Sequence, residues 1–254
     1  MNTRRARAGV AQLHLEPALV RMAQRRCADL ARSGVADHGG FDDLESADPD
    51  STRELARRGW AVAEEDLAQG DVLTALRTRF LPSLYHSLGF MMPERRAIGM
   101  ADTGGFAVVL LAGGPADKPA LVCDPYPGEQ DVGLAGHYLE DPDPFAPHRD
   151  HMRGAPAGVA VKLLVSGPPI TLQSATLSCG LGNGLSAEVP VWVNHPGNDG
   201  NVGNAVSMIP RRPLEPGREY TATVEVRTKD GVLSRTWSFR TVKAPQRPLP
   251  SGAR

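Results

Sequence analysis

The second half of the chain consists of short apolar runs separated by turn residues, and few folds accommodate this pattern. The runs are Val159 to Leu164, Ile170 to Leu177, Val189 to Asn194, Ala205 to Ile209, Glu219 to Arg227 and Leu233 to Arg240. The dipeptide Asp230-Gly231 between the last two predicts a tight hairpin. Evenly spaced strands with Pro, Gly and Asn turns, and no competing helical periodicity, predict an all-β sandwich.

The first part of the chain has a different pattern, in which helices surround a hairpin. Pro17 opens a run with apolar residues at helical spacing, and Gly34 ends it. Ser51 and Glu54 have the spacing of a capping box at the start of another helix. The apolar segments 97–101 and 106–111 flank a Gly-containing turn, which predicts a hairpin. We therefore expect a small antiparallel sheet with helices on both sides, and an α+β class for the whole chain.

The two patterns meet at a stretch with linker composition. Residues 113–119 read Gly-Gly-Pro-Ala-Asp-Lys-Pro. At 254 residues the chain is also longer than one typical domain. We predict a first domain at 1–114, a β-sandwich domain at 119–243 and a disordered tail at 244–254.

Composition excludes several classes of partner. A net charge of -1 gives no electrostatic case for nucleic acid or an anionic membrane. No run approaches the roughly 18 apolar residues of a transmembrane segment, and none resembles a signal peptide. Three cysteines are too few for a disulfide framework. Cys27 is expected to be a buried thiol, whereas Cys123 and Cys179 are either bonded to each other or are core thiols.

Three polar residues are candidates for a site. His86 lies between an aromatic residue and apolar clusters in the stretch 80–93, where a polar ring needs a partner or a function. His38 follows the first long helix, and Glu65 is the middle acid of a Glu-Glu-Asp triplet. Each also has a simpler interpretation, as a helix-end histidine bonded to carbonyl groups or as surface charge.

These segments resemble the CAP superfamily (cysteine-rich secretory proteins, antigen 5 and pathogenesis-related proteins) in its bacterial form. The family run Trp-x-x-Ser-x-x-His-Arg-x-x-Leu-Leu-x-Pro is similar to the chain at Ser83, His86 and Pro93, with Phe80 for the Trp and Ser87 for the Arg. Further similar positions are Asn2, Arg5, Gly9 and Leu13 in the first helix motif, and residues 60–70 against Gly-Tyr-x-x-x-Gly-Glu-Asn-Ile-Ala-x-Gly. The second part resembles the immunoglobulin-like domain that follows some bacterial CAP domains.

The resemblance implies a fold, a location and a pocket. The fold is a CAP-type α-β-α sandwich followed by an all-β immunoglobulin-like sandwich. The location is extracellular or on the cell surface, with a signal segment that this chain does not contain. The pocket gathers His38, Glu65 and His86, while the second pocket glutamate of the family has no counterpart that can be placed.

The chemistry of these three residues leaves alternatives open. Two imidazoles and a carboxylate suit a divalent metal such as zinc, with calcium as the other choice. They equally suit a general base or a polar anchor for a ligand. We expect a protein that binds a small apolar or polar ligand, a metal or a cell-surface component, with the second domain as a spacer or adhesion module. The alternatives are a metal-assisted hydrolase of peptide or cell-wall material, with Glu65 as base, and a non-catalytic scaffold with a decayed pocket.

Other candidate sites have weaker support. Ser83 and Ser87 lie near His86 in the sequence, but the chain lacks the Gly-x-Ser-x-Gly elbow of serine hydrolases. The acidic loop 42–50 is more typical of solvated surface than of a calcium site. Another group of polar residues consists of His137, His148, Asp150 and His151. This group is more typical of an exposed polar loop than of a metal site.

Overall fold

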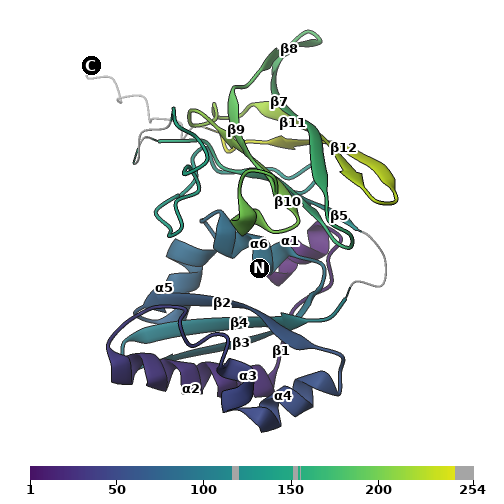
Figure 1. Ribbon diagram of the computed structural model, residues 1–254. Coiled ribbons are helices and arrows are strands. Elements are labelled where there is room, and N and C mark those ends of the chain that lie inside the picture. The colour runs from purple at the N-terminus through teal and green to yellow at the C-terminus, as the bar shows by residue number, and fades with distance from the viewer. Residues whose placement is uncertain (116–119, 151–153, 155, 244–254) are drawn as a thin grey trace, which may run out of the picture.

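The computed structural model describes residues 1–115, 120–150, 154 and 156–243, and these residues form three four-stranded sheets (Figure 1). The first sheet has the order β1-β3-β4-β2. Its strands are β1 (His14–Leu15), β2 (Ala61–Gln69), β3 (Arg95–Thr103) and β4 (Phe106–Gly113). The hairpin of β3 and β4 forms as predicted, and β2 pairs with β4 in antiparallel register.

Helices cover both faces of this first sheet (Figure 1). On one side lie α2 (Pro17–Ser33), α3 (Leu44–Ala47) and α4 (Pro49–Ala56). On the other lie α1 (Asn2–Arg7), α5 (Val72–Ala75), the π-helix η1 (Leu76–Phe80) and α6 (Tyr85–Met91). In the part of the chain that the structure describes, none of the helices has the length and apolar character needed to cross a membrane.

Strand β4 supplies the centre of both cores of this part. All its residues are buried, and their side chains point alternately to the two faces of the sheet. Val108 and Leu110 pack with Leu19 and other residues of α2, whereas Val109 and Leu111 belong to the cluster that contains Phe80 and Phe90.

The helix ends follow local capping chemistry. The Glu16 side chain accepts a hydrogen bond from the Ala18 amide at the start of α2, and Gly34 ends the helix with φ 71°. Helix α4 begins at Pro49, because the Asp48 side chain accepts from the Ser51 amide. The predicted capping box at Ser51 is therefore wrong, since a better cap precedes it.

Arg5 joins the N-terminal segment to the end of α6. Its side chain is fully buried and donates hydrogen bonds to the carbonyl oxygens of Ala11, Phe90, Met92 and Arg95 at 2.6–3.2 Å. Burial, with the charges of nearby arginines, lowers its pKa to about 10. Four carbonyl acceptors stabilise the guanidinium and fix this end of α6.

The second part is a β-sandwich. One sheet has the order β5-β6-β10-β9 and the other β12-β11-β7-β8, with antiparallel pairing throughout the named strands. The strands are β5 (Leu121–Asp124), β6 (Val161–Val165), β7 (Thr171–Gly182), β8 (Leu185–Glu188), β9 (Val191–Asn194), β10 (Ala205–Pro210), β11 (Glu219–Thr228) and β12 (Gly231–Arg240), with the 3-10 helix η2 (Gly200–Val202) before β10. Side chains from both sheets form one core, so the prediction of an all-β, immunoglobulin-like sandwich is confirmed as an architecture.

All three cysteines are buried free thiols. Cys123 and Cys179 belong to the sandwich core, and Cys27 belongs to the core beneath α2. Burial raises the pKa of Cys27 and of Cys123, which keeps these thiols protonated. The alternative of a Cys123–Cys179 disulfide is therefore wrong.

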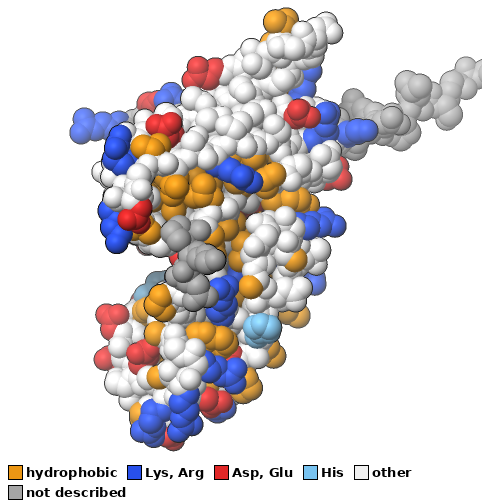
Figure 2. Space-filling model, turned by 90° about the vertical axis from the view of Figure 1, so that its right-hand side faces the viewer, with side chains coloured by type: hydrophobic (Ala, Val, Ile, Leu, Met, Phe, Trp, Pro, Cys, Tyr) orange, Lys and Arg blue, Asp and Glu red, His pale blue; other side chains and the backbone are white. Residues whose placement is uncertain are grey.

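Helix α6 lies between the first sheet and the sandwich (Figure 1). Phe90 packs toward the sheet, while Leu84, Leu88 and Met91 join two clusters with residues of the sandwich. Figure 2 shows that the molecule narrows on one side between these two parts. The predicted domain boundary falls between β4 and β5 and stays a prediction, and the predicted tail at 244–254 lies outside the described residues.

Candidate functional site

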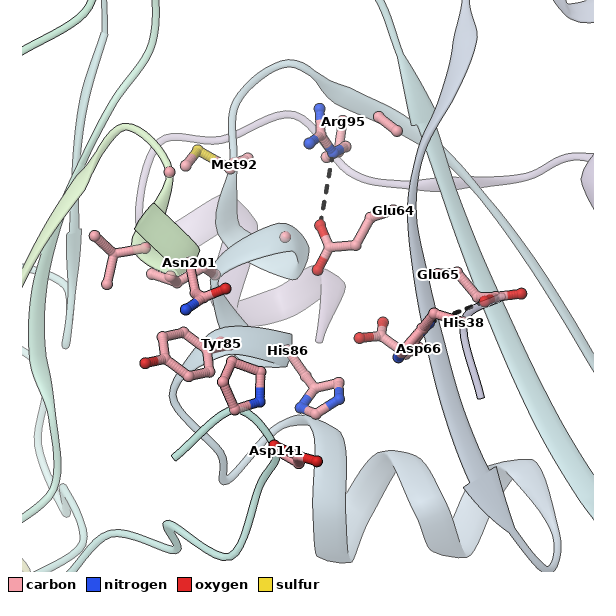
Figure 3. Close-up of a pocket in the computed structure, with 16 residues that line it drawn as sticks. His38, Glu64, Glu65, Asp66, Tyr85, His86, Met92, Arg95, Asp141 and Asn201 are labelled. Carbon is pink, nitrogen blue, oxygen red and sulfur yellow. Dashed lines mark hydrogen bonds and ion pairs between the residues drawn. The ribbon is translucent and has the colours of Figure 1, made fainter. Parts of the chain in front are cut away.

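A cleft opens where β2 and α6 face loops of the sandwich (Figure 3). Its volume is about 330 Å³, and its lining includes His38, Glu65 and His86 together with Asp141 and Asn201 of the second part. A second cavity of about 610 Å³ is also lined by His38, His86 and Asp141. The fold therefore brings the three predicted residues to one cleft, although they come from three distant segments.

Glu65 is held by partners on the α2 side of β2. Its Oε1 accepts from Arg26 Nε at 2.8 Å, and its Oε2 lies 2.9 Å from Nδ1 of His38. The side chains of Glu65 and Arg26 are 1% and 8% exposed, whereas that of His38 is 57% exposed. Both carboxylate oxygens are thus engaged by the protein itself.

His86 has a defined tautomer. Its Nδ1 lies 3.1 Å from Ser83 Oγ and 3.2 Å from Glu140 Oε2. Ser83 Oγ donates its own hydrogen to the Phe80 carbonyl, so it accepts from the ring, as the carboxylate does. Nδ1 therefore carries a proton, and Nε2 has no hydrogen-bond partner in the described residues.

Glu140, which sequence reasoning missed as a site residue, comes from the loop between β5 and β6 of the sandwich. Its side chain is 2% exposed and accepts from the amides of Leu84 and Tyr85 at 2.6 and 3.0 Å, at the start of α6. The sequence shows only an acid next to prolines, which indicates a loop. The contact depends on how the sandwich packs against α6, and no local pattern contains that information.

Glu64 and Asp66 lie on the opposite side of β2 from Glu65, toward α6, because side chains alternate along a strand. Glu64 Oε2 is 3.8 Å from Arg95 Nε. Burial raises the pKa of Glu64 to about 7, against the opposing effect of Arg95. Gly89 of α6 lies so close to the Glu64 carboxylate that a Cβ at this position would overlap it.

Asp66 is the most unusual acid of the cleft. It is 1% exposed, and its Oδ2 has no hydrogen-bond partner among the residues described. Burial raises its pKa well above the ordinary range, and the charges of Glu64, Glu65 and Glu140 raise it further. A buried carboxyl group without a partner is costly, so this arrangement needs a proton or a ligand.

The geometry gives limited support to a metal at His38, Glu65 and His86. Within the described part of the chain, no group of three or more His, Cys, Asp or Glu side chains is placed to hold a metal ion. Arg26 brings a positive charge to Glu65, and Nδ1 of His86 is occupied. Zinc or calcium binding by these three residues therefore stays a prediction.

The weaker candidate sites have structural partners. Ser87 Oγ donates within its helix and accepts from Lys162 Nζ at 2.7 Å, so it is no free nucleophile. His148 Nε2 contacts Asn194 Oδ1 at 2.9 Å, and Asp150 accepts from Arg211 at 2.6 Å. His151 lies outside the described residues.

Comparisons with known proteins give no family. No family model matches the chain, and no curated protein matches it. Similar solved structures include selenomethionine PcoC, a copper resistance protein from Escherichia coli, with 16% identity over 47% of this chain and 94% of that chain and a TM-score of 0.30. Murine CRIg has 14% identity over 34% of this chain and 85% of that chain, with a TM-score of 0.26. Likenesses of this size place no functional residue on the chain.

The assignment to the CAP superfamily is wrong, because no family model matches and these similar solved structures belong to other proteins. The residues that suggested it have local roles instead. Asn2 exchanges hydrogen bonds with the Leu13 backbone, and Arg5 binds four carbonyl groups. Ser83 binds the Phe80 carbonyl. These roles are local and do not depend on a CAP fold. The predicted CAP-type sandwich is corrected to a four-stranded sheet with α2 on one face and short helices on the other.

Proposed function

We propose that the chain binds a small ligand in the cleft between β2, α6 and the loops of the sandwich. One observation carries the proposal: apolar and polar side chains from both parts of the chain line one cavity of about 330 Å³. The apolar side is formed by Leu88, Met92 and Val202. Polar groups that converge beside an apolar wall can fix the orientation of a small molecule.

His86 gives this cleft a fixed recognition group. Glu140 and Ser83 hold its Nδ1, and the ring packs 5.2 Å from that of Phe80. A donor on the ligand meets Nε2 in a ring that is already ordered, so little side-chain entropy is lost on binding.

Metal-assisted hydrolysis has less support. A general base must reach the water that it activates, but the Glu65 side chain is 1% exposed and both of its oxygens are bound to Arg26 and His38. The scaffold alternative explains neither the unpartnered Asp66 oxygen nor the ordered His86. The extracellular or cell-surface location, with the sandwich as spacer or adhesion module, belongs to the same proposal and is tested by cell fractionation.

The test is a binding screen with a variant that blocks the cleft. A panel of small cationic, neutral and anionic compounds, together with Zn²⁺ and Ca²⁺, is titrated while the amide resonances of Glu64 and Gly89 are followed by NMR. Asn201 is exposed and lines the cleft, so Asn201→Trp is expected to abolish binding. Gln173→Trp, on exposed β7, is the matched control and is expected to bind as the parent does.

The double variant His38→Ala, His86→Ala tests the two histidines in the same screen and in elemental analysis of the purified protein. If no panel member shifts the cleft resonances, or if Asn201→Trp binds as well as the parent, the proposed function is overturned.

A further inference from the structure

We propose that the ligand of this cleft is a small organic cation whose ammonium group lies against Asp66 and Glu64. This inference rests on the proposed function and names the chemical class of its ligand.

The charges around the cleft favour a cation. Its acidic lining residues are Glu64, Glu65, Asp66 and Asp141, and its basic residue is Arg95. Glu65 is paired with Arg26 on the other side of β2. Arg95 lies 3.8 Å from Glu64, beyond the distance of a hydrogen bond, so it balances this charge only in part. Apart from Glu65, the lining thus offers three acidic groups, those of Glu64, Asp66 and Asp141, against the single guanidinium of Arg95.

A second and independent observation is the unpartnered oxygen of Asp66. The side chain is 1% exposed, and Oδ2 lacks a partner in the described part of the protein. Figure 3 shows the carboxyl groups of Asp66 and Glu64 directed toward the space beside His86. A donor from the ligand there would remove the cost of an unsatisfied buried acceptor.

An ammonium group fits these acceptors better than a metal ion does. It carries three donors, and the cleft offers the carboxylates of Glu64 and Asp66 and the free Nε2 of His86. A metal ion needs several ligands at fixed short distances, and the described residues contain no such group. The apolar body of the cation would contact Leu88, Met92 and the ring of Tyr85.

The experiment compares three compounds that share one hydrocarbon body: benzylammonium, benzyl alcohol and benzoate. Each is titrated into the full chain at constant pH and ionic strength, with ligand- and protein-detected NMR. We expect benzylammonium to bind about tenfold more tightly than benzyl alcohol, as a charged hydrogen bond requires, and benzoate to bind more weakly than either.

The matched variants are Asp66→Asn and Asp42→Asn. Asp42 is exposed and distant in sequence, so its substitution removes the same charge outside the cleft. Asp66→Asn is expected to weaken benzylammonium about tenfold while leaving benzyl alcohol unchanged, and Asp42→Asn to change neither. Near-UV circular dichroism checks that each variant is folded, and Glu64→Gln gives a second test if Asp66→Asn is not.

The outcomes separate this inference from the proposed function. Preferential binding of benzyl alcohol or benzoate in the cleft overturns the ammonium assignment and supports a ligand site of another class. An equal loss of benzylammonium affinity in Asp66→Asn and Asp42→Asn would show unspecific charge attraction. This result would also overturn the ammonium assignment. If none of the three compounds binds, the ammonium assignment fails, and the wider panel decides the proposed function.

Discussion

Two groups of buried acids contact α6 and differ in how their charge is balanced. Asp124 of β5 is bound by Lys162 Nζ at 2.7 Å and by Arg4, and Lys162 also donates to Ser87 of α6. Burial alone would raise the pKa of Asp124, but the two cations lower it to about 2. Glu64, at the cleft, has Arg95 only at 3.8 Å, and its pKa is raised to about 7.

This contrast distinguishes a charge that is balanced within the fold, that of Asp124, from acids that are available for binding. The Asp124 group joins the helical part to the sandwich with every acid oxygen bound, so a ligand has nothing to add. Asp66 at the cleft is buried at least as deeply as Asp124, but it keeps an oxygen without a partner among the described residues. Burial therefore does not identify a binding site by itself, whereas incomplete pairing within a cavity does.

The largest expected effect comes from breaking the saturated group. Lys162→Met leaves the buried carboxylate of Asp124 with Arg4 alone and removes a donor to Ser87. We expect the free energy of unfolding to fall by about 3 kcal/mol, at the lower end for a broken buried pair because Arg4 remains. Urea denaturation at neutral pH measures it.

Lys229→Met is the control for this prediction. Lys229 is exposed in the turn between β11 and β12, so its loss should change stability by less than about 0.5 kcal/mol. Equal effects of the two substitutions would show that the Asp124 group does not hold the two parts together.

A smaller loss of stability is expected on substitution of Glu140, which has features of both acid groups. It stabilises α6, as the Asp124 group does, but it also orients His86 in the cleft. Glu140→Ala removes the acceptor of two backbone amides, and we expect a loss of about 2 kcal/mol. Hydrogen exchange should accelerate at the amides of Leu84 and Tyr85.

Glu129→Ala provides the comparison for Glu140. Glu129 also accepts from a backbone amide, that of Tyr126, but among the described residues it makes no hydrogen bond to α6. The Glu129→Ala substitution should leave the hydrogen exchange of the Leu84 and Tyr85 amides unchanged. Unaltered exchange in Glu140→Ala as well would mean that the carboxylate does not cap α6.

The sequence predicts those features that depend on neighbouring residues. The Gly stop of α2, the β3–β4 hairpin and the strands of the sandwich follow from local spacing. His38, Glu65 and His86 all appear in the lining of one cleft, and their role as a site stays a prediction. The family assignment failed because it rested on short spacings, and residues in them such as Arg5 and Ser83 bind carbonyl groups of the local backbone.

What could not be predicted depends on packing between distant segments. Glu140 meets α6 only because the sandwich packs against it. Within the triplet 64–66, the period-2 alternation of a strand turns Glu65 away from Glu64 and Asp66. Arg26 then takes Glu65 out of the cleft chemistry, and no sequence pattern marks that pair.

The smallest expected effect is on the pH dependence of stability, which has opposite signs for the two acid groups. For Glu64, the pKa near 7 in the folded state exceeds the value of about 4.3 in an unfolded chain. Between these values the folded state holds more protons, so stability falls as the pH rises. Asp124 has the opposite sign: its pKa is lowered, so its contribution is present above about pH 4 and is lost as the pH falls toward 2.

The double variant Glu64→Gln, Asp66→Asn tests this difference. Its stability relative to the parent should rise by about 1–2 kcal/mol per pH unit between about pH 5 and pH 7, because in the parent each of the two acids loses a proton on unfolding there, which contributes up to about 1.4 kcal/mol per pH unit. The stability of the control variant Asp42→Asn should have the same pH dependence as that of the parent. Urea denaturation at several pH values gives the slope. A parallel course of double variant and parent would mean that the acids at the cleft are as well balanced as Asp124, and the cleft would then have no unpaired charge for a cation to neutralise.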